Sequence, residues 1–330
     1  MTDPKERGTT DPEATGTTPL NPRTGELTSR TSEVAARPTA RQWLAGARPR
    51  TLPIAVAPVL AGSGLAYFAG GFRWPAALLA LVVSLALQVG VNYANDYSDG
   101  IRGTDAQRVG PLRLVGSGLA SPPAVRRAAM VSFGVAGVAG LLLVIVTGHW
   151  WLLAVGVACV LAAWFYTGGR RPYGYRGLGE VFVFVFFGLV AVGGTAYVQV
   201  GHLSPAIGLT GVGIGALACA ILVANNLRDI AGDEKVGKRT LATRLGEART
   251  RGLYTVLAGL AAVMIIAVAG LTSAWALLGL AGLLLLVPAL RTVLSGGQGT
   301  ALVGVLKTTG LAELASAAGL AAGLLLATVV

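Results

Sequence analysis

Residues 92–100 read Asn-Tyr-Ala-Asn-Asp-Tyr-Ser-Asp-Gly, and this polar run continues an apolar segment at about residues 74–95. If the apolar segment is a helix that extends through the polar run, Asn92, Asp96 and Asp99 are spaced i, i+4 and i+7. Residues at this spacing lie on one face of a helix. The sequence therefore predicts a long helix that is apolar along most of its length and presents an acidic face at its end.

A second polar run of the same kind occurs later in the chain. Residues 225–234 read Asn-Asn-Leu-Arg-Asp-Ile-Ala-Gly-Asp-Glu and continue another apolar segment, at about residues 206–227. Here Asn225, Asp229 and Asp233 are spaced i, i+4 and i+8, again on one face of a helix. We predict an internal duplication that brings two similar acidic faces toward one cavity, a pattern found among membrane bundles.

The composition places these segments in a membrane. Of 330 residues, 54% are hydrophobic and only 12% are charged, whereas a soluble domain carries roughly 25% charged residues. We predict an all-α, polytopic membrane protein in which about nine transmembrane helices form a bundle with an internal pseudo-repeat. Residues 1–36, rich in Thr, Pro, Gly and charge, are predicted to be a disordered tail, and residues 37–330 the transmembrane domain. The predicted helices cover about residues 51–69, 74–95, 125–147, 150–167, 178–199, 206–227, 252–270, 274–291 and 308–328.

The basic residues predict the orientation of this bundle. A net charge of +11 could indicate nucleic-acid binding, but the lysines and arginines lie in the connections between apolar segments. If nine helices alternate in direction, all of the 26 lysines and arginines except Arg73 fall on one side, which the positive-inside rule makes cytoplasmic. We therefore expect no nucleic acid, a multi-pass protein of the cell (plasma) membrane, a cytoplasmic N-terminus and an external C-terminus. The long, charged connections at 96–124 and 228–251 place the predicted site on the cytoplasmic side.

The crowded carboxylates predict a divalent metal ion. Carboxylates that are crowded at a membrane surface repel one another. A Mg²⁺ ion reduces this repulsion by binding one or two carboxylates together with substrate phosphate oxygens. The alternative is that these residues are solvated charges at helix ends, but two matched faces on one side of the membrane favour the metal. The predicted Mg²⁺ ligands are Asp96, Asp99, Asp105, Asp229 and Asp233, and the predicted phosphate-binding residues include Arg108, Arg113, Arg228, Lys235 and Lys238.

The two runs also resemble a known family. Asn95-Asp-Tyr-Ser-Asp99 and Asn226-Leu-Arg-Asp229-x-x-x-Asp233 resemble the paired Asp motifs of UbiA-type intramembrane aromatic prenyltransferases, nine-helix enzymes that use Mg²⁺ to activate a polyprenyl diphosphate. The resemblance covers about residues 40–328 and is most detailed for the branch of the family whose acceptor is 1,4-dihydroxy-2-naphthoate. Two positions depart from more distant branches, since Gly103 stands where they place an Asp and Arg170 where some place a Lys. The segments that resemble the naphthoate branch are Gly103-Thr-Asp105, Gly110-Pro-Leu-Arg113, Gly116-Ser-Gly118, Tyr166-Thr-Gly-Gly169, Leu178-Gly-Glu180 and Gly237-Lys-Arg-Thr-Leu241.

The resemblance implies a specific reaction in the lipid bilayer. Diphosphate leaves the prenyl chain, the electron-rich ring attacks the cation-like carbon, and CO₂ leaves, which gives demethylmenaquinone in menaquinone biosynthesis. The ring of Tyr166 would stabilise the cation, unless it is an ordinary tyrosine of the membrane interface. Arg48 and Arg50 would bind the acceptor carboxylate, unless they only anchor the bundle by charge. The expected catalytic residues are Asp96, Asp99, Asp229, Asp233 and Tyr166, and the further substrate-binding residues are Asn92, Asn95, Asn225, Asn226 and Arg170.

Three alternatives compete with this interpretation. The same chemistry could use another aromatic acceptor, such as 4-hydroxybenzoate. A CDP-alcohol phosphotransferase also has an Asp-x-x-Asp-Gly helix, but it needs Ala-Arg soon after and two more aspartates on the next helix, whereas Ile101-Arg-Gly103 follows here. A transporter would place ionisable residues deep inside the spans, whereas these acids lie at helix ends. The prenyltransferase interpretation is therefore preferred.

Overall fold

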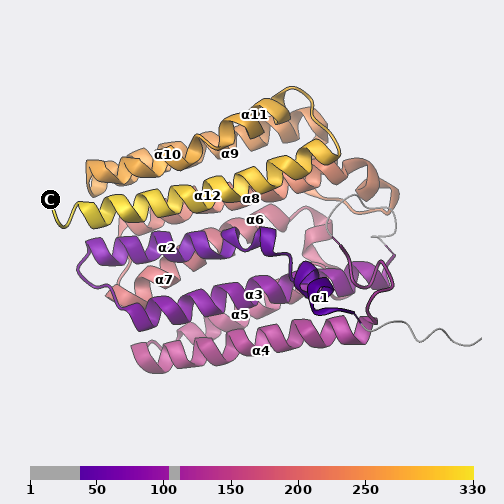
Figure 1. Ribbon diagram of the computed structural model, residues 1–330, viewed down its shortest axis with the longest axis horizontal. Coiled ribbons are helices and arrows are strands. Elements are labelled where there is room, and N and C mark those ends of the chain that lie inside the picture. Colours follow the sequence, from indigo (N-terminus) through magenta and orange to yellow (C-terminus); the bar gives the residue numbers. More distant parts are fainter. Residues whose placement is uncertain (1–37, 104–111) are drawn as a thin grey trace, which may run out of the picture. The chain divides into compact units, whose positions relative to one another are not determined.

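The computed structural model describes residues 38–103 and 112–330, so the predictions for the tail and for Asp105 and Arg108 lie outside the described residues. Within these ranges every regular element is a helix, and Figure 1 shows the long ones running alongside one another. The first half contains α1 (Ala40–Ala47), the short turn η1 (Pro49–Thr51), α2 (Pro53–Phe68), α3 (Trp74–Ile101), α4 (Pro122–Thr147) and α5 (Leu152–Phe165).

The second half has longer helices and two irregular spans. After the turn η2 (Tyr173–Arg176), one continuous span is built from α6 (Gly179–Val183), the π-helical η3 (Phe184–Val190) and α7 (Ala191–Val200). A second irregular span follows α9 and bends by 48° between α10 and α11. The other elements of this half are α8 (Pro205–Lys235), α9 (Leu241–Leu271), η4 (Ala274–Leu278), α10 (Gly279–Leu283), α11 (Leu286–Leu294) and α12 (Thr300–Leu326).

The chain is a multi-pass, all-helical membrane protein, as the sequence predicts. Each of the nine predicted segments falls on helix. By length and composition, six of the described helices can cross a membrane, or eight if each bent pair counts as one span. The remaining segment, α5, has only 14 residues, which is shorter than the ~20 residues that span the hydrocarbon core. Nine spans therefore stays a prediction.

Helix ends on the side opposite the acidic runs are set by simple caps. Pro205 occupies the first position of α8, where its missing N–H costs nothing, and the preceding Ser204 side chain accepts a hydrogen bond from the backbone N–H of Ile207. Gly148 and Gly201 end α4 and α7 with φ of 78° each, the left-handed conformation that glycine adopts without strain. These caps keep the turns short and leave that side with little room for a site.

Consecutive helices form the largest contacts of the bundle, and the internal duplication stays a prediction. Each motif helix makes its most extensive contact with the helix that follows it, α3 with α4 and α8 with α9, and α12 packs on α2 (Figure 1). Small residues allow close approach in the second half: a Cβ at Gly188 would lie 2.6 Å from the Cα of Gly215. Close backbone packing is the main attraction between helices in lipid. The result is a bundle in which α3 and α8 each pack mainly on the helix that follows them.

The structure corrects the predicted connections. The long connection expected at 228–251 is mostly helical, because α8 runs to Lys235 and α9 begins at Leu241. The first acidic run is also helical, since α3 ends only at Ile101. The charged residues at these positions therefore do not end the helices. As a result, both acidic runs are carried on rigid helix.

Candidate active site

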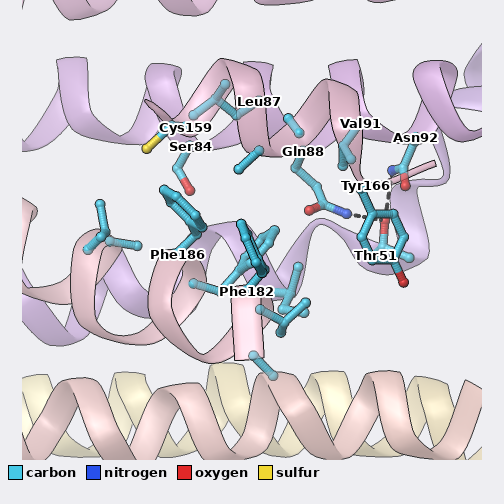
Figure 2. Close-up of a pocket in the computed structure, with 18 of the residues that line it drawn as sticks. Thr51, Ser84, Leu87, Gln88, Val91, Asn92, Cys159, Tyr166, Phe182 and Phe186 are labelled. Carbon is cyan, nitrogen blue, oxygen red and sulfur yellow. Dashed lines mark hydrogen bonds between the residues drawn. The ribbon is translucent and has the colours of Figure 1, made fainter. Parts of the chain in front are cut away.

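A cavity of about 1230 Å³ lies between helices of both halves. Apolar side chains of α3, α4, α5 and the π-helical span line much of it. Figure 2 shows part of the lining, with Leu87 and Val91 of α3 and Phe182 and Phe186 of the π-helical span. Polar residues from both motif helices line the same cavity. The sequence-predicted residues that reach it are Arg48, Arg50, Asn92, Asn95, Asp99, Arg113, Tyr166, Asn225, Asn226, Arg228 and Lys238.

Asp99 is the carboxylate of the first run that lines the cavity. The hydroxyl of Tyr175 donates to its Oδ1 at 2.6 Å, and Nη2 of Arg113 lies 4.0 Å from its Oδ2. The ring of Tyr175 lies under two cations, Arg102 at 5.4 Å and Lys238 at 5.0 Å from the ring centroid. Sequence reasoning missed Tyr175, because its position in η2 gave no sign that it returns to α3.

Asp96 lies against the backbone of residues 114–115, outside the cavity lining. It is completely buried, and its two oxygens accept the backbone N–H groups of Leu114 at 2.7 Å and Val115 at 3.0 Å. It is not among the residues that line the cavity. The carboxylate holds the chain segment that presents Arg113 and so has a positioning role, while its role as a metal ligand stays a prediction.

The second run presents its cations to the cavity. Arg228 lines the cavity and donates to both oxygens of Asp229, at 2.7 and 2.8 Å, and to Oδ1 of Asn225 at 2.9 Å. Lys238, also in the lining, pairs with Asp233 at 3.4 Å. The two aspartates are buried, and they are absent from the lining itself. In this arrangement the carboxylates of α8 orient two cations that face the cavity.

Hydrogen bonds fix two of the asparagine side chains. Thr167 donates its hydroxyl proton to Oδ1 of Asn95 at 2.8 Å, which leaves the amide N–H groups of Asn95 available. Asn226 donates through Nδ2 to Oε1 of the buried Glu180 at 2.9 Å. Glu180 therefore positions Asn226, a role that the sequence alone did not resolve.

An aromatic cluster forms part of the cavity wall. The rings of Tyr166 and Tyr173 meet edge to face at 5.5 Å, and Tyr173 stacks on Phe182 at 3.9 Å. Burial raises the pKa of the Tyr173 phenol, whose hydroxyl donates to the carbonyl oxygen of Ala162 at 2.7 Å. These rings line the cavity, and the π face of an aromatic ring favours a nearby cation.

Other sequence-predicted residues are not brought to the cavity. Arg170 and Lys235 are exposed and are not part of the lining. Sequence reasoning also overlooked lining residues inside apolar segments, above all Gln88 and Thr51, and the cation Lys307 near the start of α12. The signal for Gln88 was present, because it lies one turn before Asn92 on the same face of α3.

The donor set can be compared with what Mg²⁺ requires. Among residues 38–103 and 112–330, no three Asp, Glu, His or Cys side chains form a group that could hold a metal ion. Mg²⁺ does not need such a group, since it commonly takes one or two carboxylates plus waters and phosphate oxygens. Asp99 in the lining, with amide oxygens nearby on α3 and α8, supplies hard donors of this kind. The residues fit an ion that a diphosphate helps to bind.

Comparison with known proteins agrees with this geometry. Residues 55–302 match the model of the UbiA prenyltransferase family. A 1,4-dihydroxy-2-naphthoate octaprenyltransferase of Mycobacterium tuberculosis is 53% identical over 86% of this chain and 96% of its own length. One from Escherichia coli is 42% identical over 65% of this chain and 72% of its own length.

Solved structures share the fold at low sequence identity. A UbiA homologue from Archaeoglobus fulgidus bound to DMAPP and Mg²⁺ superimposes with a TM-score of 0.59 at 13% identity, covering 84% of this chain and 99% of that one. The apo UbiA homologue from Aeropyrum pernix gives a TM-score of 0.63 at 17% identity, covering 83% of this chain and 97% of that one. By its sequence match, its cavity and its helical architecture, this chain belongs to the UbiA prenyltransferase family.

Proposed function

We propose that this prenyltransferase moves a polyprenyl group from a polyprenyl diphosphate to 1,4-dihydroxy-2-naphthoate, with Mg²⁺ as cofactor and with loss of diphosphate and CO₂. The product would be demethylmenaquinol, the reduced form of demethylmenaquinone. The observation that carries the reaction class is one cavity that joins the ends of both motif helices to a long apolar interior. The identity of 53% to a 1,4-dihydroxy-2-naphthoate octaprenyltransferase supports the acceptor.

The polar end of the cavity suits a diphosphate. Arg113, Arg228 and Lys238 line it from different elements, and cations with several N–H donors bind phosphate oxygens strongly. Asp99 faces the same space and, with Asp229 and Asp233, would hold Mg²⁺; the ion, when bound, would neutralise diphosphate charge and stabilise it as a leaving group. The Mg²⁺ and DMAPP bound to the Archaeoglobus fulgidus homologue are consistent with this assignment.

The apolar interior suits the prenyl chain and the aromatic acceptor. The C–O bond to the diphosphate breaks, and its electron pair leaves with the diphosphate. The resulting cation-like carbon lies beside the ring of Tyr166, which stabilises positive charge through its π face. A ring carbon of the acceptor forms the new C–C bond, and the bond to the carboxylate breaks so that its electrons restore the aromatic ring and CO₂ departs. The protein's own work is to orient the two substrates and exclude water.

The orientation in the membrane follows from charge. We propose that the ends of α3 and α8 face the cytoplasm of a plasma membrane, with the N-terminus on that side and the C-terminus outside. The cations Arg113, Arg228 and Lys238 all lie at these ends. Lys and Arg accumulate on the cytoplasmic side of membrane proteins, and a water-soluble diphosphate would then leave into the cytoplasm.

A transfer assay tests the function directly. The purified protein in detergent or liposomes would receive a prenyl diphosphate, Mg²⁺ and either 1,4-dihydroxy-2-naphthoate or 4-hydroxybenzoate. We expect prenylated product and one CO₂ per product from the naphthoate, and no product from the benzoate. Product from the benzoate alone would retain the prenyltransferase chemistry but reject the proposed acceptor.

A further inference from the structure

A single hydroxyl group in the cavity wall fixes the direction of two amide side chains. Thr51 lies in the turn η1 and lines the cavity. Its Oγ1 donates to the carbonyl oxygen of Arg48 at 2.9 Å and accepts from Nε2 of Gln88 and Nδ2 of Asn92, each at 3.0 Å. A hydroxyl has one proton and two acceptor lone pairs, so these three bonds use the full capacity of Thr51.

This saturation determines which end of each amide faces the cavity. Nδ2 of Asn92 also donates to the carbonyl oxygen of Ala47 at 2.9 Å, and a carbonyl oxygen can only accept. The nitrogen of Asn92 must therefore lie on this side. Because the only proton of Thr51 goes to Arg48, the Gln88 atom that contacts Thr51 must also be a nitrogen. Both side-chain carbonyl oxygens consequently point away from Thr51.

These two oxygens form a face that can only accept hydrogen bonds. Gln88 is 5% exposed and Asn92 4% exposed, and both line the cavity one helical turn apart on α3; Figure 2 shows them beside Thr51 and Tyr166. Oε1 of Gln88 is buried without a hydrogen-bond partner among the described residues, and the side-chain hydrogen bonds of Asn92 to Ala47 and Thr51 use only its nitrogen. A buried acceptor without a donor is destabilising, so a molecule bound here gains by supplying an O–H or N–H group.

The chemistry of the two substrates of the proposed function decides which one this face binds. An ionised diphosphate offers acceptors, and a prenyl chain offers only C–H groups, so neither can donate to Gln88 or Asn92. The dihydroxynaphthoate has two O–H groups. We propose that the side-chain oxygens of Gln88 and Asn92, oriented by Thr51, bind the hydroxyl groups of the aromatic acceptor. This inference rests on the proposed function and specifies which residues recognise the acceptor.

The neighbouring residues agree with this subsite. Arg48 and Arg50 line the cavity beside Thr51 and suit the carboxylate of the same acceptor. Asp99 lies three turns beyond Gln88 along α3, about 16 Å by helical rise, so the diphosphate and the aromatic hydroxyls occupy different parts of one wall. A hydroxyl that donates to a carbonyl oxygen also carries more electron density into its ring, which favours attack on the prenyl carbon.

The test compares acceptors that differ by one hydroxyl. Binding of 1,4-dihydroxy-2-naphthoate, 1-hydroxy-2-naphthoate and 4-hydroxy-2-naphthoate would be measured from naphthoate fluorescence, and KM values from the transfer assay. We expect the wild type to favour the dihydroxy compound over at least one monohydroxy compound by about 10-fold. In Gln88→Met and in Thr51→Val this preference should fall below about 2-fold, while the KM for prenyl diphosphate stays unchanged.

The control is Thr210→Val, which removes a buried hydroxyl that has no hydrogen-bond partner among the described residues and lies outside this cavity. It should keep the wild-type preference, and size-exclusion profiles should show that all variants fold. An unchanged preference in both Gln88→Met and Thr51→Val would overturn the proposal, as would a wild type that does not discriminate. If the wild type prenylates 4-hydroxybenzoate but neither binds nor prenylates any naphthoate, both the proposed acceptor and this subsite are rejected.

Discussion

The ends of α3 and α8 carry similar sequences but use their carboxylates differently. On α3, Asp96 accepts two backbone N–H groups and Asp99 accepts the hydroxyl of Tyr175. On α8, Asp229 and Asp233 are paired directly with Arg228 and Lys238. Two similar sequences therefore form one end that presents a carboxylate to the cavity and one end that presents cations.

This difference makes the two ends complementary. A metal–diphosphate complex needs carboxylate oxygens for the ion and N–H donors for the phosphate oxygens. Asp99 lines the cavity from the α3 end, and Arg228 and Lys238 line it from the α8 end, so the two ends contribute different groups to the same space. We infer that the site needs the two halves of the chain to act together, and each of the following predictions tests one side of that comparison.

The largest effect is expected at Asp99. Asp99→Asn keeps the shape of the side chain but removes the charge that would hold Mg²⁺, so transfer should fall by about 10³-fold. Steady-state kinetics would measure it, and far-UV circular dichroism would show that the helices remain. Activity within about 3-fold of wild type would remove Asp99 from the proposed site.

A smaller loss is expected on the α8 side. Asp229→Asn removes the carboxylate that holds Arg228 at 2.7 Å, so the guanidinium should lose its fixed direction, and kcat/KM for prenyl diphosphate should fall by about 10²-fold. The KM for the aromatic acceptor should change little. If acceptor KM rises instead, the α8 end serves the other substrate.

Substitution of Asp96 should lower the stability of the fold and have only a moderate effect on activity. In Asp96→Asn an amide replaces a carboxylate that accepts two backbone N–H groups, so one N–H of the 114–115 segment loses its acceptor. The cost of an unsatisfied buried group is about 1–3 kcal/mol, and thermal unfolding in detergent should show a lower Tm. Activity should fall by only about 10-fold, because Arg113 is displaced but Asp99 remains. A 10³-fold loss with an unchanged Tm would instead support the prediction that Asp96 is a metal ligand.

The smallest effect is expected at Tyr175. Tyr175→Phe removes the hydroxyl that donates to Asp99 and should lower kcat/KM by about 5-fold, close to the value of one hydrogen bond. Tyr254→Phe is the matched control, because it removes a buried hydroxyl on α9 that bonds Thr309 on α12, away from the cavity. That variant should lose stability and keep its kcat/KM, and equal kinetic losses in the two variants would argue against a role for Tyr175.

Much of the fold could be predicted from the sequence. Apolar length and charge density indicate helices in lipid, and the i, i+4 spacing of Asn225 and Asp229 predicts a shared helix that α8 confirms. The prediction of a long connection at 228–251 was wrong, because α8 continues to Lys235 and α9 begins at Leu241. Charged residues indicate contact with water, but they do not show that a helix has ended. Residues 150–167 form a shorter helix than predicted, since α5 ends at Phe165, two residues before Thr167-Gly-Gly169.

The site was less predictable than the fold. Spacing could not show that Asp96 faces a returning backbone segment while Asp99 faces the cavity, because that depends on where residues 112–115 fold back. The role of Thr51 was also beyond the sequence, since two of its three partners lie on α3, 37 and 41 residues away along the chain. Long-range contacts of this kind leave no periodic signal.

The central claim is that α3 and α8 form one site, and a double-mutant cycle on ligand binding tests it most directly. Binding of geranyl diphosphate would be titrated with and without Mg²⁺ in the wild type, Asp99→Asn, Asp229→Asn and the double variant. Our account predicts Mg²⁺-dependent binding in the wild type, its loss in each single variant, and little further loss in the double variant, because coupled groups are not additive. Additive losses, or a single variant that binds as the wild type does, would contradict a site shared by the two helices.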